Sequence, residues 1–366
     1  MTQIDVAPTA QTTAFAELLK SASTPHELGC YRGVLTPREL DAPEAESEAL
    51  ACRAAGHDLG WLRRVAVRGE DRFRWLSGMV TNMVNDLEEN AGAWNLVLNA
   101  QGRIQGDLTV WREGDRLELE IAADQYDRLL AHLDRFIIMD DVELVPLDGE
   151  AALGLTGPAA SEVLARVGLP VLSEPMTATR IEWNGMDLRI AREYGTAAAH
   201  YVLWVPEAQL GKLWKFLHAA GATPVGCASL EAFRIAEGIP LYGVDMAERD
   251  LPQETSQMRA IHFSKGCYLG QEIVERIRSR GNVHKHLRQL ELDGPVPAAG
   301  TELIAEGETA GGHITSAAEL ALSSGARVFA LGMMRAEAEV RDAPFAYGAG
   351  LAAGTARLLA APPSFQ

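Results

Sequence analysis

The chain is poor in cysteine, in positive charge and in long apolar runs. Its 366 residues contain four cysteines, Cys30, Cys52, Cys227 and Cys267, which lie far apart and form no CxxC pair. A chain of this length does not need disulfides, and such spacing is typical of the reducing cytosol. No apolar run approaches the ~18–20 residues of a membrane span. The N-terminus shows no basic segment followed by an apolar one, so we expect a cytoplasmic protein without a secretory signal.

Acidic residues outnumber basic ones, with 50 Asp and Glu against 33 Lys and Arg, and the formal net charge is −17. This charge disfavours general binding to nucleic acid or to anionic membranes, so neither is expected as a partner. Hydrophobic residues make up 47% of the chain, which is enough for a large core. Because single cores stop growing at roughly 250–300 residues, we expect two or more domains.

Two successive blocks of alternating strands and helices precede a region of short strands. Apolar periodicity predicts one α+β unit over residues 57–146 and a second over 147–282. From residue 283 to 362, short strands separated by Gly and Pro predict a small β-barrel or sandwich, with Glu337–Val340 as one of its strands. The sequence therefore predicts an α+β protein with a C-terminal all-β region.

The most distinctive segment is Lys265–Glu272, which has the sequence KGCYLGQE. Its glycines permit positive φ angles, and an ammonium near a cysteine favours the reactive thiolate. The segment fits a reactive or ligating Cys267, and it also fits a tight turn with an incidental cysteine. One thiolate cannot complete a zinc or iron–sulfur site, which needs about four ligands, so no metal site within the chain is expected.

Asp107 is a second candidate, just before the apolar strand 108–111 and after a turn at 99–103. A carboxylate there is suited to face a pocket and to accept hydrogen bonds from the N–H groups of a heterocycle. A solvated aspartate beside a turn is the alternative.

The segment Arg234–Asp245 is a third candidate. A helix is expected to end at Gly238, since glycine is the usual residue after a helix C-terminus. The loop that follows carries Pro240 and Tyr242, and loops with aromatic and charged residues often line sites. An ordinary exit from a helix is the alternative.

A local basic run is the fourth candidate in this acidic chain. Bidentate contacts from its arginines suit carboxylates or phosphates, while a solvated face paired with Glu272 and Glu275 is the alternative. The run comprises Arg276, Arg278, Arg280, Lys285 and Arg288.

KGCYLGQE closely resembles the motif that defines the YgfZ family of folate-binding proteins, which are relatives of the glycine-cleavage T-protein (aminomethyltransferase). Further segments resemble this superfamily in the same order along the chain, from about Leu28 to Leu359. They are Trp75–Asn82, Asn99–Asp107, Gly157-Pro158, Arg234–Asp245 and Gly311–Ser316. The resemblance implies two ferredoxin-like α+β units and a C-terminal β-barrel, which form a three-lobed ring around a central hole that holds tetrahydrofolate.

The resemblance also implies roles for single residues. Asp107 matches the aspartate that binds and orients the pterin in T-proteins, and the implied folate site adds Met79, Tyr242 and Arg234. Cys267 is the working thiol, which Lys265 biases toward thiolate, so that Cys267, Lys265 and Asp107 are the candidate catalytic residues. The implied motif residues are Lys265, Gly266, Cys267, Tyr268, Gly270, Gln271 and Glu272, of which the glycines shape the loop and Gln271 and Glu272 cap or orient it.

The chain departs from the T-protein pattern at two positions. Val202 stands where T-proteins have a glutamate, and Leu230 stands where they have an arginine. Valine cannot accept pterin N–H groups, and the loss of such a contact typically costs ~1–3 kcal/mol. These departures favour a YgfZ-type role over aminomethyl transfer.

A YgfZ-type role implies support of iron–sulfur cluster assembly or repair in client enzymes, including radical-SAM enzymes that modify tRNA. A folate-dependent aminomethyltransferase or demethylase is the second interpretation. The third is a non-enzymatic scaffold for iron–sulfur carrier proteins, in which Cys267 donates one ligand to a shared cluster.

Overall fold

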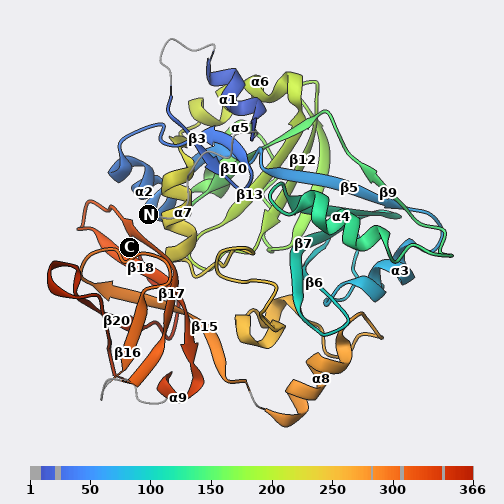
Figure 1. Cartoon of the computed structure of the whole chain (residues 1–366). Helices are drawn as coiled ribbons and strands as arrows, with labels where there is room; N and C mark the ends of the chain where they lie inside the picture. The colour runs from blue at the N-terminus through green and yellow to red at the C-terminus, as the bar shows by residue number, and fades with distance from the viewer. Residues whose placement is uncertain (1–9, 21–25, 282, 306–308, 340–342, 366) are drawn as a thin grey trace.

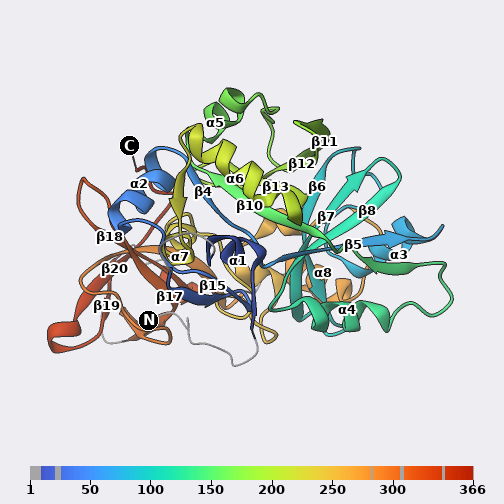
Figure 2. The same ribbon diagram turned by 90° about the horizontal axis from the view of Figure 1, so that it is seen from above.

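The computed structural model describes residues 10–20, 26–281, 283–305, 309–339 and 343–365. Two lobes are each built on an open sheet with helices, antiparallel in the first and mixed in the second, and the third is a closed β-barrel (Figure 1). Two views show the barrel at the opposite end of the molecule from α3 (Arg72–Met79) and α4 (Tyr126–Asp134) (Figures 1 and 2). This is the α+β architecture with a C-terminal barrel that the sequence predicts.

The first unit has a five-stranded sheet in the order β6-β7-β8-β5-β9. Its strands are β5 (Leu62–Arg68), β6 (Gly92–Leu98), β7 (Ile104–Glu113), β8 (Arg116–Ala122) and β9 (Glu143–Pro146). The leucines of β8 pack with α3 and α4 on one face of the sheet. The glutamates that alternate with them, Glu118 and Glu120, are also buried, because the other face meets the second unit.

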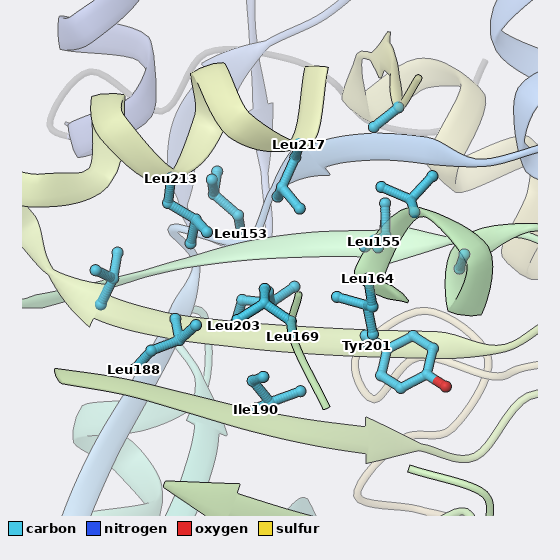
Figure 3. Packing of buried hydrophobic residues seen from close by; sticks show 14 of the residues in the cluster. Leu153, Leu155, Leu164, Leu169, Leu188, Ile190, Tyr201, Leu203, Leu213 and Leu217 are labelled. Carbon is cyan, nitrogen blue, oxygen red and sulfur yellow. The ribbon is translucent and has the colours of Figure 1, made fainter. Parts of the chain in front are cut away.

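The second unit has a six-stranded sheet in the order β11-β12-β13-β10-β4-β14. Its strands are β4 (Ala55–Asp58), β10 (Glu150–Thr156), β11 (Thr177–Trp183), β12 (Met186–Glu193), β13 (His200–Pro206) and β14 (Thr223–Val225). The helices α1 (Ala14–Lys20), α5 (Ala160–Val167) and α6 (Leu210–Ala219) cover one face. Figure 3 shows the leucine-rich core there, with Leu153, Leu203 and Leu213 among its members. Although β4 precedes the first unit in the chain, it pairs with β10.

The inner faces of the two sheets meet through polar contacts. Arg64 on β5 pairs with Glu118 on β8 and with Glu150 on β10, and Arg189 on β12 pairs with Glu113 on β7. Removing one partner of such a buried pair is strongly destabilising, because the other charge is left uncompensated. The contacts therefore fix how the two units sit against each other.

The barrel closes in the order β15-β18-β17-β16-β19-β20. Its strands are β15 (Lys285–Asp293), β16 (Glu302–Ala305), β17 (Thr309–Leu320), β18 (Arg327–Arg335), β19 (Phe345–Tyr347) and β20 (Gly354–Leu358). It packs against α2 (Pro43–Cys52) and α7 (Cys227–Ala236) through a shared apolar cluster that contains Phe233 and Phe329. A small sheet of β1 (Gln11–Thr12), β3 (Val34–Pro37) and β2 (Leu28–Tyr31) precedes α2.

Two local expectations are wrong. Residues 337–339 belong to a short helix, α9 (Ala336–Glu339), rather than a strand, since Ala and Glu favour helix; Val340 lies outside the described residues. Asp107 lies within β7, which begins at Ile104, and not before the strand. Within the described residues, no helix is long and apolar enough to cross a bilayer.

Candidate functional site

A cavity of about 250 Å³ lies between the two α+β units. This is close to the lower end of the ~300–1,000 Å³ typical of small-molecule sites. Its walls come from the inner faces of both sheets, from α7 and from the loop after α7. Aromatic side chains, among them Trp61, Trp94 and Phe233, alternate with charged ones around it. A flat, polar-edged ligand suits such walls.

Asp107 lines this cavity and is held by two donors. Its Oδ2 accepts the indole N–H of Trp94 at 2.9 Å, and its Oδ1 accepts the side-chain amide of Gln125 at 2.9 Å. Gln125 also accepts the backbone N–H of Asp107 at 3.1 Å. A carboxylate offers about four lone-pair sites, so these contacts fix its orientation and leave acceptors for a ligand.

Arg234 lies on α7 and also lines the cavity, but its guanidinium has protein partners. It pairs with Glu231 one turn earlier, and its Nη1 donates to Asp245 at 2.6 Å and to the Ile239 carbonyl at 3.1 Å. Burial alone would lower its pKa, yet the charges of Glu231 and Asp245 outweigh this and raise the pKa above its usual value. Arg234 therefore ties α7 to the loop that follows, and its role in folate binding stays a prediction.

Met79 and Tyr242 lie within the described part of the chain, and neither lines the cavity. Met79 ends α3 and packs at the edge of the helix-side core of the first unit. The Tyr242 hydroxyl donates to the Ile104 carbonyl at 3.4 Å, and its ring faces the guanidinium of Arg128 at 4.8 Å. Their proposed contact with folate remains a prediction.

Of the two departures from the T-protein pattern, Leu230 lies at the cavity and Val202 packs between the two units. Leu230 on α7 is a lining residue. Val202 on β13 is 2% exposed and packs with Ala191 and Trp204 in an apolar cluster between the units. The cavity wall therefore has no cation from position 230, and position 202 supplies apolar packing instead of an acceptor.

Three charged residues that sequence reasoning missed also line the cavity: Glu120, Glu193 and Arg259. Glu193, at the end of β12, is hydrogen-bonded to Glu120 on β8, and burial together with the Glu120 charge raises the pKa of Glu193. Arg259 stacks on Tyr194 at 3.9 Å and on Trp94 at 4.5 Å, and burial lowers its pKa to about 10. The alternation of glutamates with leucines in β8 is the pattern of a strand with one solvent-exposed face, so the sequence carries no local signal for these residues.

A chain of polar groups crosses another wall of the cavity. His57 Nε2 contacts Thr156 Oγ1 at 3.0 Å, Thr156 Oγ1 contacts His200 Nδ1 at 3.3 Å, and His200 Nε2 contacts Glu237 at 2.6 Å. The His57 ring lies over Gly154, where a Cβ would come within 1.8 Å of it, so glycine is required there. Burial lowers the pKa of His57 to about 3, which keeps this ring neutral.

Cys267 does not share the cavity with Asp107. Its side chain is exposed, and it is not one of the residues that line the cavity. The neighbouring Tyr268 is 8% exposed and packs in an apolar cluster with Ile104 and Trp94. The thiol therefore faces solvent, while the next residue, Tyr268, is buried and holds the loop to the core.

The ammonium of Lys265 contacts backbone carbonyls of the first unit. It donates to the carbonyls of Ser77 at 2.7 Å, Val80 at 2.6 Å and Asn82 at 2.8 Å, at and just beyond the C-terminus of α3, where a cation is favourable. Burial lowers the pKa of Lys265 to about 7. All three N–H donors have acceptors, so Lys265 fastens the Cys267 loop to α3, and its effect on the thiol stays a prediction.

The two glycines of the motif differ. Gly270 has φ +82° at the start of α8 (Gln271–Arg280), and a Cβ there would lie 2.6 Å from the Asn99 carbonyl oxygen. Gly266 has open space around it, and its φ is not in the positive range. Gln271 and Glu272 form the first turn of α8, and Glu272 is exposed.

The basic run divides among separate contacts. Arg288 pairs with Glu339 at 2.8 Å and Lys285 with Asp250 at 2.6 Å, while Arg276 lines a separate, open hollow of about 690 Å³ beside α8. Within the described residues, no group of three or more His, Cys, Asp or Glu is arranged to hold a metal ion.

The fold and the cavity define a three-lobed α+β protein with a cavity between its two α+β units. The structure resembles the crystal structure of glycine cleavage system aminomethyltransferase T from Bartonella henselae, with a TM-score of 0.86 over 97% of this chain and 98% of that chain, at 19% sequence identity. At this identity the likeness establishes the fold, and it agrees with the architecture that the sequence predicted.

The chain belongs to the family of the GCVT N-terminal domain, whose model matches residues 21–265. It is 29% identical over 294 residues to an aminomethyltransferase of Rubrobacter xylanophilus, which covers 78% of this chain and 78% of that protein. An aminomethyltransferase of Geobacillus kaustophilus is 26% identical over 291 residues, covering 77% of this chain and 80% of that protein. Membership of the T-protein superfamily is therefore confirmed.

Proposed function

We propose that this protein binds a reduced folate in the cavity between its two α+β units, with Asp107 as the anchor. The observation that carries the proposal is the orientation of Asp107 by Trp94 and Gln125 toward an aromatic-lined cavity. A pterin ring has flat faces for the aromatic walls and N–H groups for carboxylates, so the residues present fit it. A bound tetrahydrofolate would supply a carrier for one-carbon units, and Asp107 would accept an N–H group of its pterin.

Calorimetric titration with 5-formyltetrahydrofolate tests this proposal. We expect the unaltered protein to bind and Asp107→Asn to raise the Kd by about tenfold to a hundredfold, as expected when one hydrogen bond to a charged group is lost. Asp127→Asn, a matched change at an exposed position on α4, should leave the Kd unchanged. Absence of binding by the unaltered protein would refute the proposal.

We further propose that the protein acts as a YgfZ-type cytoplasmic factor that supports iron–sulfur cluster assembly or repair in client enzymes, including tRNA modification enzymes. Support comes from the KGCYLGQE segment, from the exposed position of Cys267 outside the cavity, and from the apolar residues Leu230 at the cavity wall and Val202 between the units. Cys267 would then face a partner protein and not the folate.

A deletion strain complemented with variants tests this role. Cys267→Ala should fail to restore the activity of an iron–sulfur client enzyme, whereas Cys30→Ala, at a partly exposed cysteine on β2, should restore it. Full restoration by Cys267→Ala would exclude a role for the thiol. Cluster-dependent complex formation without any heat from folate would instead indicate a scaffold for iron–sulfur carriers.

Folate-dependent aminomethyl transfer is the second candidate, and the names of the relatives support it more directly than they support the first. It predicts turnover with tetrahydrofolate and an aminomethyl or methylamine donor, abolished by Asp107→Asn and retained by Cys267→Ala. In either case we propose that residues 27–282 form the folate-binding region and residues 283–362 the barrel.

A further inference from the structure

Val202 offers no acceptor, but the neighbouring strand places a carboxyl that lines the cavity, Glu193, close to the same position. In the antiparallel pair of β12 and β13, Ala191 lies opposite Val202 and Glu193 lies opposite His200. Because side chains alternate along a strand, Ala191 and Glu193 share the face that Val202 occupies. Glu193 is therefore the diagonal neighbour of Val202, at a Cα separation of about 7–8 Å, within reach of a long side chain.

Glu120 reaches the same place from the opposite sheet. Trp204, two residues after Val202 and on the same face of β13, donates its indole N–H to Glu120 Oε2 at 3.0 Å. Glu120 is 4% exposed, it lines the cavity, and it is hydrogen-bonded to Glu193. The two sheets thus bring one carboxyl each to the wall beside Val202.

These two carboxyls have few donors of their own. Besides the hydrogen bond that Glu193 and Glu120 share, the indole N–H of Trp204 donates to Glu120. Both carboxyls line the cavity, and a carboxyl has more acceptor sites than these contacts use, so acceptors remain for the N–H groups of a ligand there. Asp107, on β7 of the first sheet, lines the same cavity.

We propose that Glu193 and Glu120 bind the N–H edge of the pterin, its 2-amino group and ring N–H, in place of the glutamate that Val202 replaces. This inference rests on the proposed binding of folate in the cavity. Two sp² N–H donors side by side match a carboxylate in the bidentate geometry that gives strong hydrogen bonds. Two adjacent carboxyls cannot easily both be ionised, so one proton shared between them leaves a single negative charge for this edge.

Calorimetric titration of Glu193→Gln with 5-formyltetrahydrofolate tests the inference. We expect its Kd to rise by about tenfold to a hundredfold, the loss expected for a hydrogen bond to a charged group. Glu120→Gln should weaken binding in the same direction, and it serves as a second variant if Glu193→Gln does not fold. Glu182→Gln, at an exposed position on β11, is the control and should bind as the unaltered protein does.

A ligand analogue and a rescue variant show whether the effect is direct. A 2-desamino-2-methyl analogue of the same folate should bind more weakly than its parent to the unaltered protein, but equally to Glu193→Gln. Val202→Glu added to Glu193→Gln should recover part of the lost affinity, which a merely structural role of Glu193 would not produce. Thermal unfolding of each variant verifies that it is folded.

The outcomes distinguish this inference from the proposal of folate binding on which it rests. Binding by Glu193→Gln and Glu120→Gln within twofold of the unaltered protein, while Asp107→Asn binds weakly, would overturn the inference and leave folate binding intact. Failure of the unaltered protein to bind folate would overturn both.

Discussion

Replacing Glu237 with glutamine should destabilise the protein in a pH-dependent way. Glu237 follows α7 and is 1% exposed, and one of its oxygens accepts the backbone N–H groups of Thr196, Ala197 and Ala198 at 2.9–3.2 Å. Its other oxygen contacts His200 Nε2 at 2.6 Å. The carboxylate therefore holds the β12–β13 connection, and with it His200, at the cavity wall.

The magnitude follows from these contacts. Each hydrogen bond to a charged group contributes about 1.5–3 kcal/mol, and the contact with His200 counts toward the lower end because the His200 side chain is 22% exposed. Glutamine keeps one oxygen for the N–H groups but opposes His200 with a donor. We therefore expect Glu237→Gln to lower the free energy of unfolding at pH 7 by about 2–3 kcal/mol, the value of one to two hydrogen bonds to a charged group.

The direction of the Glu237 pKa shift determines how the destabilisation by Glu237→Gln changes with pH. Burial alone would raise the pKa of Glu237, but His200 and the backbone N–H groups outweigh it and lower the pKa below its usual value. A carboxyl with a lowered pKa stabilises the fold above the unfolded pKa of about 4.3, and this contribution is lost as the pH falls through the folded pKa. The difference between the unaltered protein and Glu237→Gln should therefore shrink below about pH 4.

Urea unfolding followed by tryptophan fluorescence, at pH 7 and again at pH 3–4, measures both quantities. Glu248→Gln, which changes an exposed glutamate, is the control and should alter stability by less than about 0.5 kcal/mol. An equal destabilisation by Glu237→Gln at both pH values, or none at pH 7, would refute the role assigned to the ionised carboxylate.

Three further substitutions test the loop and the cavity. Lys265→Met should lower the free energy of unfolding by about 2–4 kcal/mol in urea, because it leaves three backbone carbonyls without their donor. Gly270→Ala should lower the free energy of unfolding by about 1–2 kcal/mol for the positive φ alone, and the clash with the Asn99 carbonyl should add to this. Gly266→Ala should be nearly neutral in the same urea experiment. Equal effects of the two substitutions would contradict the loop geometry. Trp94→Phe keeps the aromatic wall but removes a donor to Asp107, so calorimetry should show folate binding weakened by about threefold to tenfold.

The order of strands and helices was largely visible in the sequence, because hydrophobic periodicity is a local signal. The two α+β blocks form two sheets with helices, and the short strands after residue 283 form the closed barrel. Pairings between distant segments were not visible. That β4 joins β10, and that Glu120 faces a second sheet rather than solvent, depends on contacts between segments separated by more than 80 residues.

The same limit applies to the site. Asp107 and Arg234 were identified by resemblance and both line the cavity, whereas Glu193 and Arg259 carry no local motif. A position-by-position comparison with the T-protein pattern shows that Val202 stands where that pattern has a glutamate. It cannot show that Glu193 lies diagonally across from Val202, because that neighbour is set by the register of β12 against β13.

The exposed thiol and the cavity are separate on the surface but joined in the core. Tyr268, the residue after Cys267, shares an apolar cluster with Trp94, which in turn donates to Asp107. A change at Tyr268 would therefore disturb both regions, whereas Cys267 is exposed and its replacement should disturb neither. For this reason Cys267→Ala isolates the chemistry of the thiol: loss of client-enzyme activity with unchanged folate affinity would assign the thiol and the cavity to different steps.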